Sequence, residues 1–256
     1  MTRVIITGAA GGIGSATVEL LRRNGASVVG LDLPECDVRS QESVDAAVSA
    51  AIAQLGGLDV LINNAGLGTP QSASVPPDED ALAVLDVNLV GVWRVTAAAL
   101  PALRESRGRV INVASGLAHM TVPFATAYTI SKRGVVAYSD VLRLEEGARV
   151  TVTTVYPGYI RTKIHEQSVA AGVPLEGAVP VEDVSDAART LTRAALGPPA
   201  RDLATTRRGT VSYALLRLAP RRAVDAVTRL MMRRLARRGH FRAEGLAGEY
   251  AARLRE

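Results

Sequence analysis

Hydrophobic positions along the chain follow two patterns: short continuous apolar runs, and longer stretches in which apolar residues recur at helical spacing. The short runs predict strands at Arg3–Thr7, Ser27–Leu31, Asp59–Asn63, Arg109–Ala114 and Val150–Val155. The helical spacing predicts helices at Ile13–Arg23, Ser40–Leu55, about Asp80–Leu103, Thr126–Glu146 and Val181–Leu196. Strands that alternate with helices indicate a parallel sheet covered on both faces. We therefore predict a single α/β domain with a doubly wound parallel sheet, whose ligands bind beyond the carboxyl ends of the strands.

The chain changes character after the last of these helices. Between Gly197 and Gly209 it is rich in Pro and Arg, and no final strand is recognisable. Further on, Pro220–Arg238 predicts one more helix, with apolar positions at Val224, Val227, Met231 and Leu235. We predict that residues 1–197 form the main domain, with a lid at about 159–180. Residues 198–256 are predicted to form an Arg-rich, mainly helical extension packed on or near the same domain.

Length and composition narrow the class of protein. A chain of 256 residues has room for one large domain, and 48% hydrophobic residues can supply its core. Cys36 is the only cysteine, so no intramolecular disulfide can form, and the three histidines lack metal-ligand spacing. We expect no metal. We also expect a cytoplasmic location, because neither a signal peptide nor an apolar run of roughly 20 residues is recognisable.

The positive charge is concentrated in the C-terminal segment. Fourteen arginines and five acidic residues follow position 200, whereas the first 200 residues hold 16 basic and 20 acidic residues. Three interpretations of this segment stay open. It is a solvated face or a subunit contact, a peripheral contact with the inner membrane surface, or a nucleic-acid site. Nucleic acid is disfavoured because the cations lack interleaved aromatic residues.

A glycine-rich turn joins the first predicted strand to the first helix. Its sequence is Thr7-Gly8-Ala9-Ala10-Gly11-Gly12-Ile13-Gly14. Glycines let the backbone approach a pyrophosphate, and the N-terminus of the following helix offers free N–H groups to it. The motif indicates a dinucleotide site that includes Gly8, Gly11, Gly12, Ile13 and Gly14. The alternative is an ordinary strand-to-helix turn.

Asp32 follows the second predicted strand, where a carboxylate can accept hydrogen bonds from the adenosine ribose of a dinucleotide. A 2′-phosphate at this place would be repelled by the carboxylate, and no Lys or Arg adjoins Asp32 in the chain to compensate. The residue therefore favours NAD over NADP as the cofactor. The alternative is that Asp32 is an ordinary loop carboxylate.

Tyr128 and Lys132 are four positions apart on a predicted helix, so their side chains share one face. The chain has six tyrosines and only two lysines, and a chance pair at this spacing is uncommon. The two side chains can therefore reach each other. The alternative is a lysine stem packed along a tyrosine ring on a solvent-facing helix.

In their order along the chain, these motifs resemble the classical short-chain dehydrogenases/reductases. Further parts of the resemblance are Asn63-Asn64-Ala65-Gly66 after the third strand, Asn88 in the next helix, Ser115 after the next strand, and Pro157-Gly158. The match extends over roughly Thr2–Leu196, and the ordered set is far more specific than any one motif. The family implies a Rossmann fold, an NAD(P) cofactor and an oxidoreductase acting on an alcohol or a carbonyl. Residues 1–197 would then be a Rossmann-type dinucleotide-binding and catalytic domain.

The resemblance implies four catalytic residues, Asn88, Ser115, Tyr128 and Lys132. Tyr128 would exchange a proton with the substrate oxygen as a hydride passes to or from the nicotinamide. A phenol has an ordinary pKa near 10, and we expect the Lys132 ammonium and the cationic nicotinamide ring to favour its anion. Lys132 would also hold the nicotinamide ribose. Ser115 would hydrogen-bond the reacting oxygen, and Asn88 would fix a water between Lys132 and solvent.

Further cofactor contacts follow from the same resemblance. Asn64, Ala65 and Gly66 would shape the adenosine side, with Asn64 more structural than catalytic. Asp37 and Val38 resemble a pair that meets the adenine. Positions that match nicotinamide contacts are Pro157, Gly158, Ile160 and Thr162.

Two departures from the family pattern stand out. Only Leu33-Pro34-Glu35-Cys36 separates Asp32 from Asp37, where the family has a whole helix, so we expect an open adenine rim. The Arg-rich segment stands in place of the usual final strand. We expect a homo-oligomer, a dimer or a tetramer, although the family's tetramer interface is built partly from that region.

The substrate should lie between Ser115 and Tyr128, where the chain is mostly apolar. This predicts a hydrophobic alcohol or ketone that is steroid-like, terpenoid or polyketide-like. His119 is interpreted as a pocket or surface residue rather than a catalytic one. Two alternatives are an NADPH-dependent 3-ketoacyl thioester reductase, against which Asp32 counts, and a catalytically silent dinucleotide sensor or scaffold.

Overall fold

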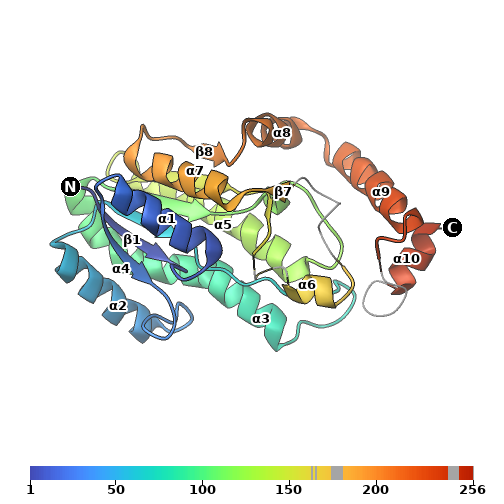
Figure 1. The fold of residues 1–256 in the computed structure, drawn as a ribbon, viewed down its shortest axis with the longest axis horizontal. Coiled ribbons are helices and arrows are strands. Elements are labelled where there is room, and N and C mark those ends of the chain that lie inside the picture. Colours follow the sequence, from blue (N-terminus) through green and yellow to red (C-terminus); the bar gives the residue numbers. More distant parts are fainter. Residues whose placement is uncertain (163, 165, 174–180, 242–247, 256) are drawn as a thin grey trace.

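The computed structural model describes residues 1–162, 164, 166–173, 181–241 and 248–255. Its centre is a parallel sheet of six strands in the order β2-β1-β3-β4-β5-β8 (Figure 1). The strands are β1 (Arg3–Thr7), β2 (Ser27–Leu31), β3 (Val60–Asn63), β4 (Arg109–Val113), β5 (Thr151–Tyr156) and β8 (Asp202–Ala204). Strand order reverses between β1 and β3, so their carboxyl ends form the edge at which a doubly wound sheet binds ligands. The predicted fold class is confirmed.

Helices cover both faces of the sheet because successive strand residues point to opposite sides. On one face, α1 (Gly12–Arg23) and α7 (Val184–Leu196) bury Leu21 and Leu191 with Ile6 and Ile62. On the other face, α2 (Gln41–Leu55), α4 (Gly91–Ser106) and α5 (Thr126–Glu146) pack against the strand residues between these. Figure 1 shows α1 and α7 on one side of the sheet and α2 and α4 on the other.

The region after β2 is short, as predicted. Residues 33–40 contain no helix or strand, and α2 begins directly after them. The N-terminal cap of α2 is Ser40, whose hydroxyl accepts a hydrogen bond from the Ser43 N–H over 3.3 Å. The sequence therefore predicted both the missing helix and the start of the next one.

One long helical stretch, Glu79–Ser106, crosses beneath the sheet. It consists of α3 (Glu79–Leu85), a π-helical turn (Asp86–Val90) and α4. By length and composition alone, this stretch is apolar enough to span a membrane. However, Val95, Ala99 and Leu103 pack in the core against the strands, so we assign it as a core helix. The sequence predicted a regular helix here and gave no sign of the π-helical turn.

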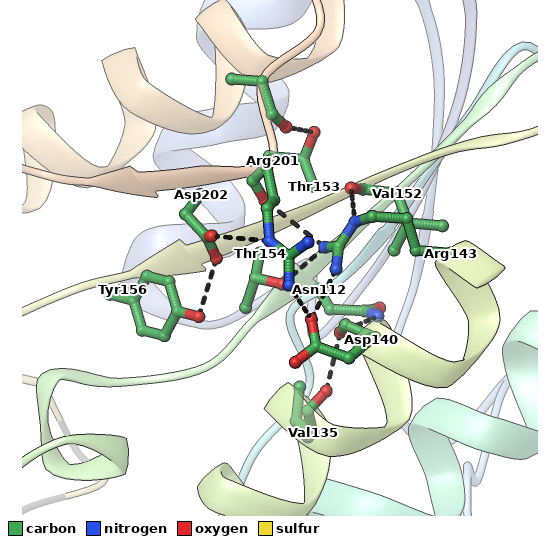
Figure 2. Close-up of polar contacts among 12 residues, drawn as sticks. Asn112, Val135, Asp140, Arg143, Val152, Thr153, Thr154, Tyr156, Arg201 and Asp202 are labelled. Carbon is green, nitrogen blue, oxygen red and sulfur yellow. Dashed lines mark hydrogen bonds and ion pairs between the residues drawn. The ribbon is translucent and has the colours of Figure 1, made fainter. Parts of the chain in front are cut away.

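The expectation that no strand follows Gly197 is wrong. β8 pairs in parallel with β5, with Leu203 opposite Val155, and completes the sheet. The phenol of Tyr156 donates to Asp202 over 2.9 Å, and Arg201 forms a 2.8 Å ion pair with Asp140 of α5 (Figure 2). The strand was missed because it has only three residues, begins with an acidic one, and is held by partners distant in sequence.

Among the described residues, three helices follow β8: α8 (Arg207–Leu218), α9 (Arg221–Arg237) and α10 (Gly248–Arg255). They extend away from the sheet (Figure 1). α9 matches the helix predicted at Pro220–Arg238. Its buried side chains, Met232 and Leu235, join Phe241 in an apolar cluster that also contains Val173 and Phe124. The prediction of a domain boundary after residue 197 stays a prediction, although the sheet itself extends to β8.

The predicted lid begins with β6 (Tyr159–Ile160) and contains the helix α6 (Glu166–Ala170). Directly after the lid, β7 (Val181–Glu182) pairs in parallel with β6 to form a short two-stranded ribbon. Residues 163, 165 and 174–180 of the predicted lid lie outside the described residues. Glu182 ties the ribbon to its surroundings, because its carboxylate accepts hydrogen bonds from the Gly158 N–H, over 2.8 Å, and from the hydroxyl of Thr205.

Candidate active site

The glycine-rich turn runs from the end of β1 to the start of α1. Gly8 has a φ of +66°, and a Cβ at this position would lie 2.7 Å from the Cα of Ala65, so glycine is required. A Cβ on Gly14 would lie 2.0 Å from the Gly8 carbonyl oxygen, so the helix starts in direct contact with the turn. Gly11 and Gly12 are exposed, and Ile13 packs partly against the core. This bare backbone at a helix N-terminus fits a pyrophosphate.

Asp32 lies beside the same turn. Its Oδ2 accepts a hydrogen bond from the Ala10 N–H over 2.7 Å, and its Oδ1 accepts one from the Leu33 N–H over 2.9 Å. A cavity of about 620 Å³ opens next to the carboxylate, with Ala9 and Gly30 among its lining residues. The position fits the adenosine end of a dinucleotide whose pyrophosphate lies on the glycine turn.

Two arginines of α1 lie at this cavity. The sequence did not predict them there, because they are distant from Asp32 in the chain. Both Arg22 and Arg23 line it. The guanidinium of Arg22 donates to the Val28 carbonyl oxygen over 3.1 Å, and Arg23 forms a 2.5 Å ion pair with Glu19. Each arginine is therefore already engaged within the protein.

Ser115 and Tyr128 meet beyond the carboxyl end of β4. Ser115 caps the short 3₁₀ turn Gly116–Ala118, where its Oγ accepts a hydrogen bond from the Leu117 N–H over 3.2 Å. Tyr128 lies in the first turn of α5, and its phenol is hydrogen-bonded to the Ser115 side chain. Burial raises the pKa of the Tyr128 phenol, and the hydrogen bond with Ser115 acts in the opposite direction. The phenol therefore holds its proton at neutral pH.

Lys132 lies one helical turn beyond Tyr128 and is buried. Its ammonium donates to the carbonyl oxygen of Val113 over 2.9 Å and lies 5.7 Å from the centre of the Tyr128 ring. Burial lowers the pKa of Lys132 to about 8. We expected the ammonium to lower the pKa of Tyr128, but in this structure burial has the larger effect and the opposite sign.

Asn88 is completely buried within the π-helical turn. Its Oδ1 accepts from the Leu67 N–H over 2.7 Å, and its Nδ2 donates to the Leu67 carbonyl oxygen over 2.9 Å. Nδ2 also lies 3.2 Å from the Oγ of Ser131, which donates to the Tyr128 carbonyl oxygen. Asn88 thus joins the chain after β3 to the helix that carries Tyr128. π-Helical turns inside α-helices often occur at functional sites.

The residues after β3 support the glycine turn. Asn64 Nδ2 donates to the carbonyl oxygens of Thr7 and Gly8, each over 3.1 Å. The Thr7 hydroxyl accepts hydrogen bonds from the N–H groups of Asn64 and Ala65. A Cβ on Gly66 would lie 3.3 Å from the Oδ1 of Asn88. This short segment therefore connects the glycine turn to Asn88.

The remaining predicted cofactor contacts fall into two groups. The Asp37 carboxylate forms a 2.7 Å ion pair with Arg39, which lowers its pKa, and Val38 is buried in the core. Neither residue lines the cavity that Asp32 borders. Beyond β5, the Pro157 carbonyl oxygen accepts from the Gly116 N–H over 2.9 Å.

The nicotinamide side of the predicted site extends from Gly158 to Thr162. Gly158 lies at the end of β5, and Ile160 is buried in β6. Thr162 reaches across to the glycine turn, since a Cβ on Gly12 would lie 3.4 Å from its methyl group. The structure thus brings Thr162 next to Gly12, although the two are 150 positions apart.

Sequence reasoning missed a contact from the C-terminal segment. The ring of Tyr213 on α8 lies over Gly116, where a Cβ would be 2.2 Å from the phenol oxygen. It also lies 5.6 Å from the ring of His119, which contacts Tyr156 at 4.8 Å. Nothing in the local pattern around Tyr213 signals this contact, because it depends on β8 and the turn that follows. His119 lies in this aromatic group.

The fold and this arrangement define the class of α/β proteins that bind a dinucleotide at the carboxyl edge of the sheet. Residues 31–171 match the short chain dehydrogenase family. The chain therefore belongs to the short-chain dehydrogenase/reductase family and is an oxidoreductase of the NAD(P)-binding type.

Three similar proteins illustrate the range of this family. The chain is 36% identical over 181 residues to human 17-beta-hydroxysteroid dehydrogenase type 6. The aligned region is 62% of this chain and 57% of that protein. It is 32% identical over 178 residues to the 3-oxoacyl-(acyl-carrier-protein) reductase FabG of Vibrio cholerae. This alignment covers 62% of this chain and 73% of the reductase. The structure of a short chain dehydrogenase from Burkholderia cenocepacia, solved in complex with NADP, superimposes with a TM-score of 0.73 at 28% identity. The superposition covers 89% of this chain and 99% of that chain.

Proposed function

We propose that this protein is an NAD(H)-dependent oxidoreductase that interconverts a hydrophobic secondary alcohol and its carbonyl compound, with Tyr128 as general acid and base. The observation that carries the proposal is the meeting of Ser115, Tyr128 and Lys132 beyond β4, at the edge where the glycine turn also opens. In this proposal the nicotinamide supplies or accepts the hydride.

The proton chemistry follows from the side chains. Tyr128 holds a proton at its phenol oxygen and can donate it to a carbonyl oxygen; in the oxidative direction the same oxygen takes the proton from an alcohol. Ser115 is hydrogen-bonded to this phenol, so a substrate oxygen in reach of one hydroxyl is in reach of the other. Lys132, with a pKa of about 8, is mostly cationic at neutral pH and favours the phenolate that proton donation leaves behind.

Asn88 has a positioning role in this proposal. It is buried and hydrogen-bonded to both backbone groups of Leu67, so it fixes the segment next to Lys132 rather than touching the substrate. The predicted water between Lys132 and solvent would lie in this region. The further cofactor contacts that we propose are Gly8, Gly11, Gly12, Ile13, Gly14, Asp32, Asp37, Val38, Asn64, Ala65, Gly66, Pro157, Gly158, Ile160 and Thr162.

The preference for NAD rests on Asp32. Its carboxylate accepts from Ala10 at the glycine turn and can also accept from a ribose hydroxyl, whereas a 2′-phosphate would be repelled. Arg22 and Arg23 line the same cavity and place positive charge there, which Glu19 offsets by its ion pair with Arg23. The NADP bound to the Burkholderia relative favours the alternative, NADP.

The proposed substrate class rests on the apolar lining between Ser115 and Tyr128. Leu117 and Val122 are buried there, and Phe124 packs against Tyr250 of α10 in an edge-to-face contact at 5.4 Å. A hydrophobic substrate, steroid-like or of similar size, suits such a site. The similarity to a hydroxysteroid dehydrogenase supports this, and the similarity to a 3-oxoacyl reductase favours the second candidate, an NADPH-dependent 3-ketoacyl thioester reductase.

Removal of the phenol oxygen of Tyr128 tests the catalytic proposal. Tyr128→Phe removes the proton donor and keeps the ring, so turnover of alcohols and ketones should fall by roughly a hundredfold or more while NADH still binds. Absorbance assays with NAD(H) and NADP(H) against a panel of apolar alcohols, ketones and 3-ketoacyl thioesters give the cofactor and the substrate class. Unchanged turnover would refute the role of Tyr128. A parent protein that binds NADH and turns over nothing would favour a silent sensor.

A further inference from the structure

Exposed apolar side chains form a stripe along α8. Val211, Leu215 and Leu218 are 61%, 63% and 84% exposed. Their spacing, i, i+4 and i+7, places them on one side of the helix. Single exposed leucines are common on protein surfaces, but a contiguous stripe of them marks a surface that contacts something.

α9 also carries exposed apolar side chains, together with many positive charges. Ala223, Val227 and Leu230 have the same spacing and are exposed, the last two by 67% and 51%. Seven arginines of residues 221–238 are exposed, against the single acidic residue Asp225. Arg222, Arg229 and Arg233 lie along one flank of the apolar stripe, at i, i+7 and i+11. Within the described part of the chain, none of these seven arginines forms an ion pair.

The opposite face of α9 packs on the substrate side of the protein. Met231, Met232 and Leu235 cluster with Val173 and Phe124, and Phe124 belongs to the loop between Ser115 and Tyr128. α9 is therefore held to the body by one face and presents a basic, apolar face outward. Amphipathic helices of this composition, rich in arginine and low in overall hydrophobicity, bind anionic bilayer surfaces.

We propose that the outer faces of α8 and α9 form a docking surface for an anionic lipid bilayer. The arginines would contact lipid phosphates, and the stripes would bury their leucine and valine side chains at the acyl boundary. Because the buried face of α9 shares its apolar cluster with Phe124, docking would bring the substrate side of the active site near the membrane. That last step rests on the proposed function, whereas the docking itself does not.

Charge and composition favour a bilayer over the other occupants. A symmetric contact between two copies would place the same arginine-rich face against itself, and like charges would repel. Nucleic acid would use stacking aromatics, but the only aromatic residue of α8 and α9 is Tyr213, which packs on Gly116. A nucleic-acid contact would also leave the apolar stripes without a role.

Vesicle co-sedimentation of the full chain tests the proposal. The probes are vesicles of phosphatidylcholine alone and of phosphatidylcholine with phosphatidylglycerol. The protein should pellet with the anionic vesicles, less so at high salt, because ions screen the contact. Arg229→Gln/Arg233→Gln should weaken partitioning by roughly 30-fold, since each arginine near an anionic surface contributes a factor of about five. Leu218→Glu should weaken it by about tenfold or more.

Leu144→Glu is the matched control, because Leu144 on α5 is 85% exposed, as much as Leu218, and lies outside the proposed surface. Its partitioning should equal that of the parent. Thermal melting and NADH binding, measured on every variant, show that the fold is intact, and neither depends on turnover. The proposal is wrong if the parent stays in the supernatant with both vesicles, or if Leu218→Glu and Leu144→Glu behave alike. It is equally wrong if vesicle binding is absent and the same substitutions instead dissociate an oligomer or abolish a shift of RNA or DNA.

Discussion

The ammonium of Lys132 donates a hydrogen bond to the backbone oxygen of Val113, 2.9 Å away, so α5 is joined to the end of β4 by a buried cation. Burial of that cation has a cost in stability, because its pKa is about 8 in the folded protein instead of its usual 10.5. Between these two values the unfolded chain binds a proton that the folded chain has lost. The contribution of Lys132 to the free energy of unfolding therefore rises with pH across this window.

Lys132→Met tests this linkage. From about pH 7 to about pH 9.5, the parent should gain about 2 kcal/mol in the free energy of unfolding relative to Lys132→Met. At neutral pH the variant should be no less stable than the parent, while its turnover falls. Urea denaturation at several pH values gives the difference. Parallel pH profiles for the two proteins would show that Lys132 is not titrating with a lowered pKa.

Asp32 should control the choice of cofactor. Asp32→Ser removes the carboxylate beside Ala10, so kcat/KM with NAD should fall by roughly 30-fold, as expected for loss of a hydrogen bond to a charged group worth about 2 kcal/mol. The value with NADP should hold or rise. Glu35→Gln is the control, because Glu35 lines the same cavity and also loses one negative charge. An equal effect of both substitutions would mean that general charge, not Asp32, sets the preference.

Asn88 should matter for folding and for turnover. Asn88→Ala leaves both backbone groups of Leu67 without partners in the protein, which should lower the free energy of unfolding by roughly 2–4 kcal/mol. Ser131→Ala removes only one of the contacts of Asn88 and should cost about 1 kcal/mol. Denaturant titration of both variants gives the comparison. Equal losses would indicate that Leu67 finds other partners when Asn88 is shortened.

Local patterns in the sequence were sufficient to predict most strands of the sheet and the glycine turn of the candidate site. Continuous apolar runs predicted β1 to β5, and the helical spacing that begins at Ser40 predicted α2. The glycine turn was recognisable because close backbone approach excludes a Cβ at Gly8. Each of these features depends on neighbours in the chain or on a rule that holds for any backbone.

Features that depend on distant partners could not be predicted. β8 is held by Tyr156 and Asp140, and its three residues carry no pattern of their own. The pKa of Tyr128 depends on how deeply the folded chain buries it, which the spacing to Lys132 does not reveal. The presence of Arg22 beside the cavity next to Asp32 likewise follows from the packing of α1 against β2.

Gly116 and Tyr213 offer a test of whether the C-terminal segment is part of the active-site structure. A Cβ on Gly116 would lie 2.2 Å from the phenol oxygen of Tyr213 and 2.8 Å from its Cζ. Gly116→Ala should therefore displace the Tyr213 ring, α8 or the turn that follows Ser115. We expect a loss of roughly 1–3 kcal/mol in stability, as for other overpacked sites, together with a loss of turnover.

The second substitution supplies the control for this prediction. Tyr213→Ala removes the clashing ring, so the double variant should recover much of the stability and turnover that Gly116→Ala alone loses. A double-mutant cycle by denaturant titration and steady-state kinetics measures the coupling. Additive effects would mean that the two residues do not touch in solution, and that α8 lies elsewhere. Strong coupling would mean that the segment beyond β8 helps to position Ser115, and that truncation after residue 204 should impair catalysis even with the sheet complete.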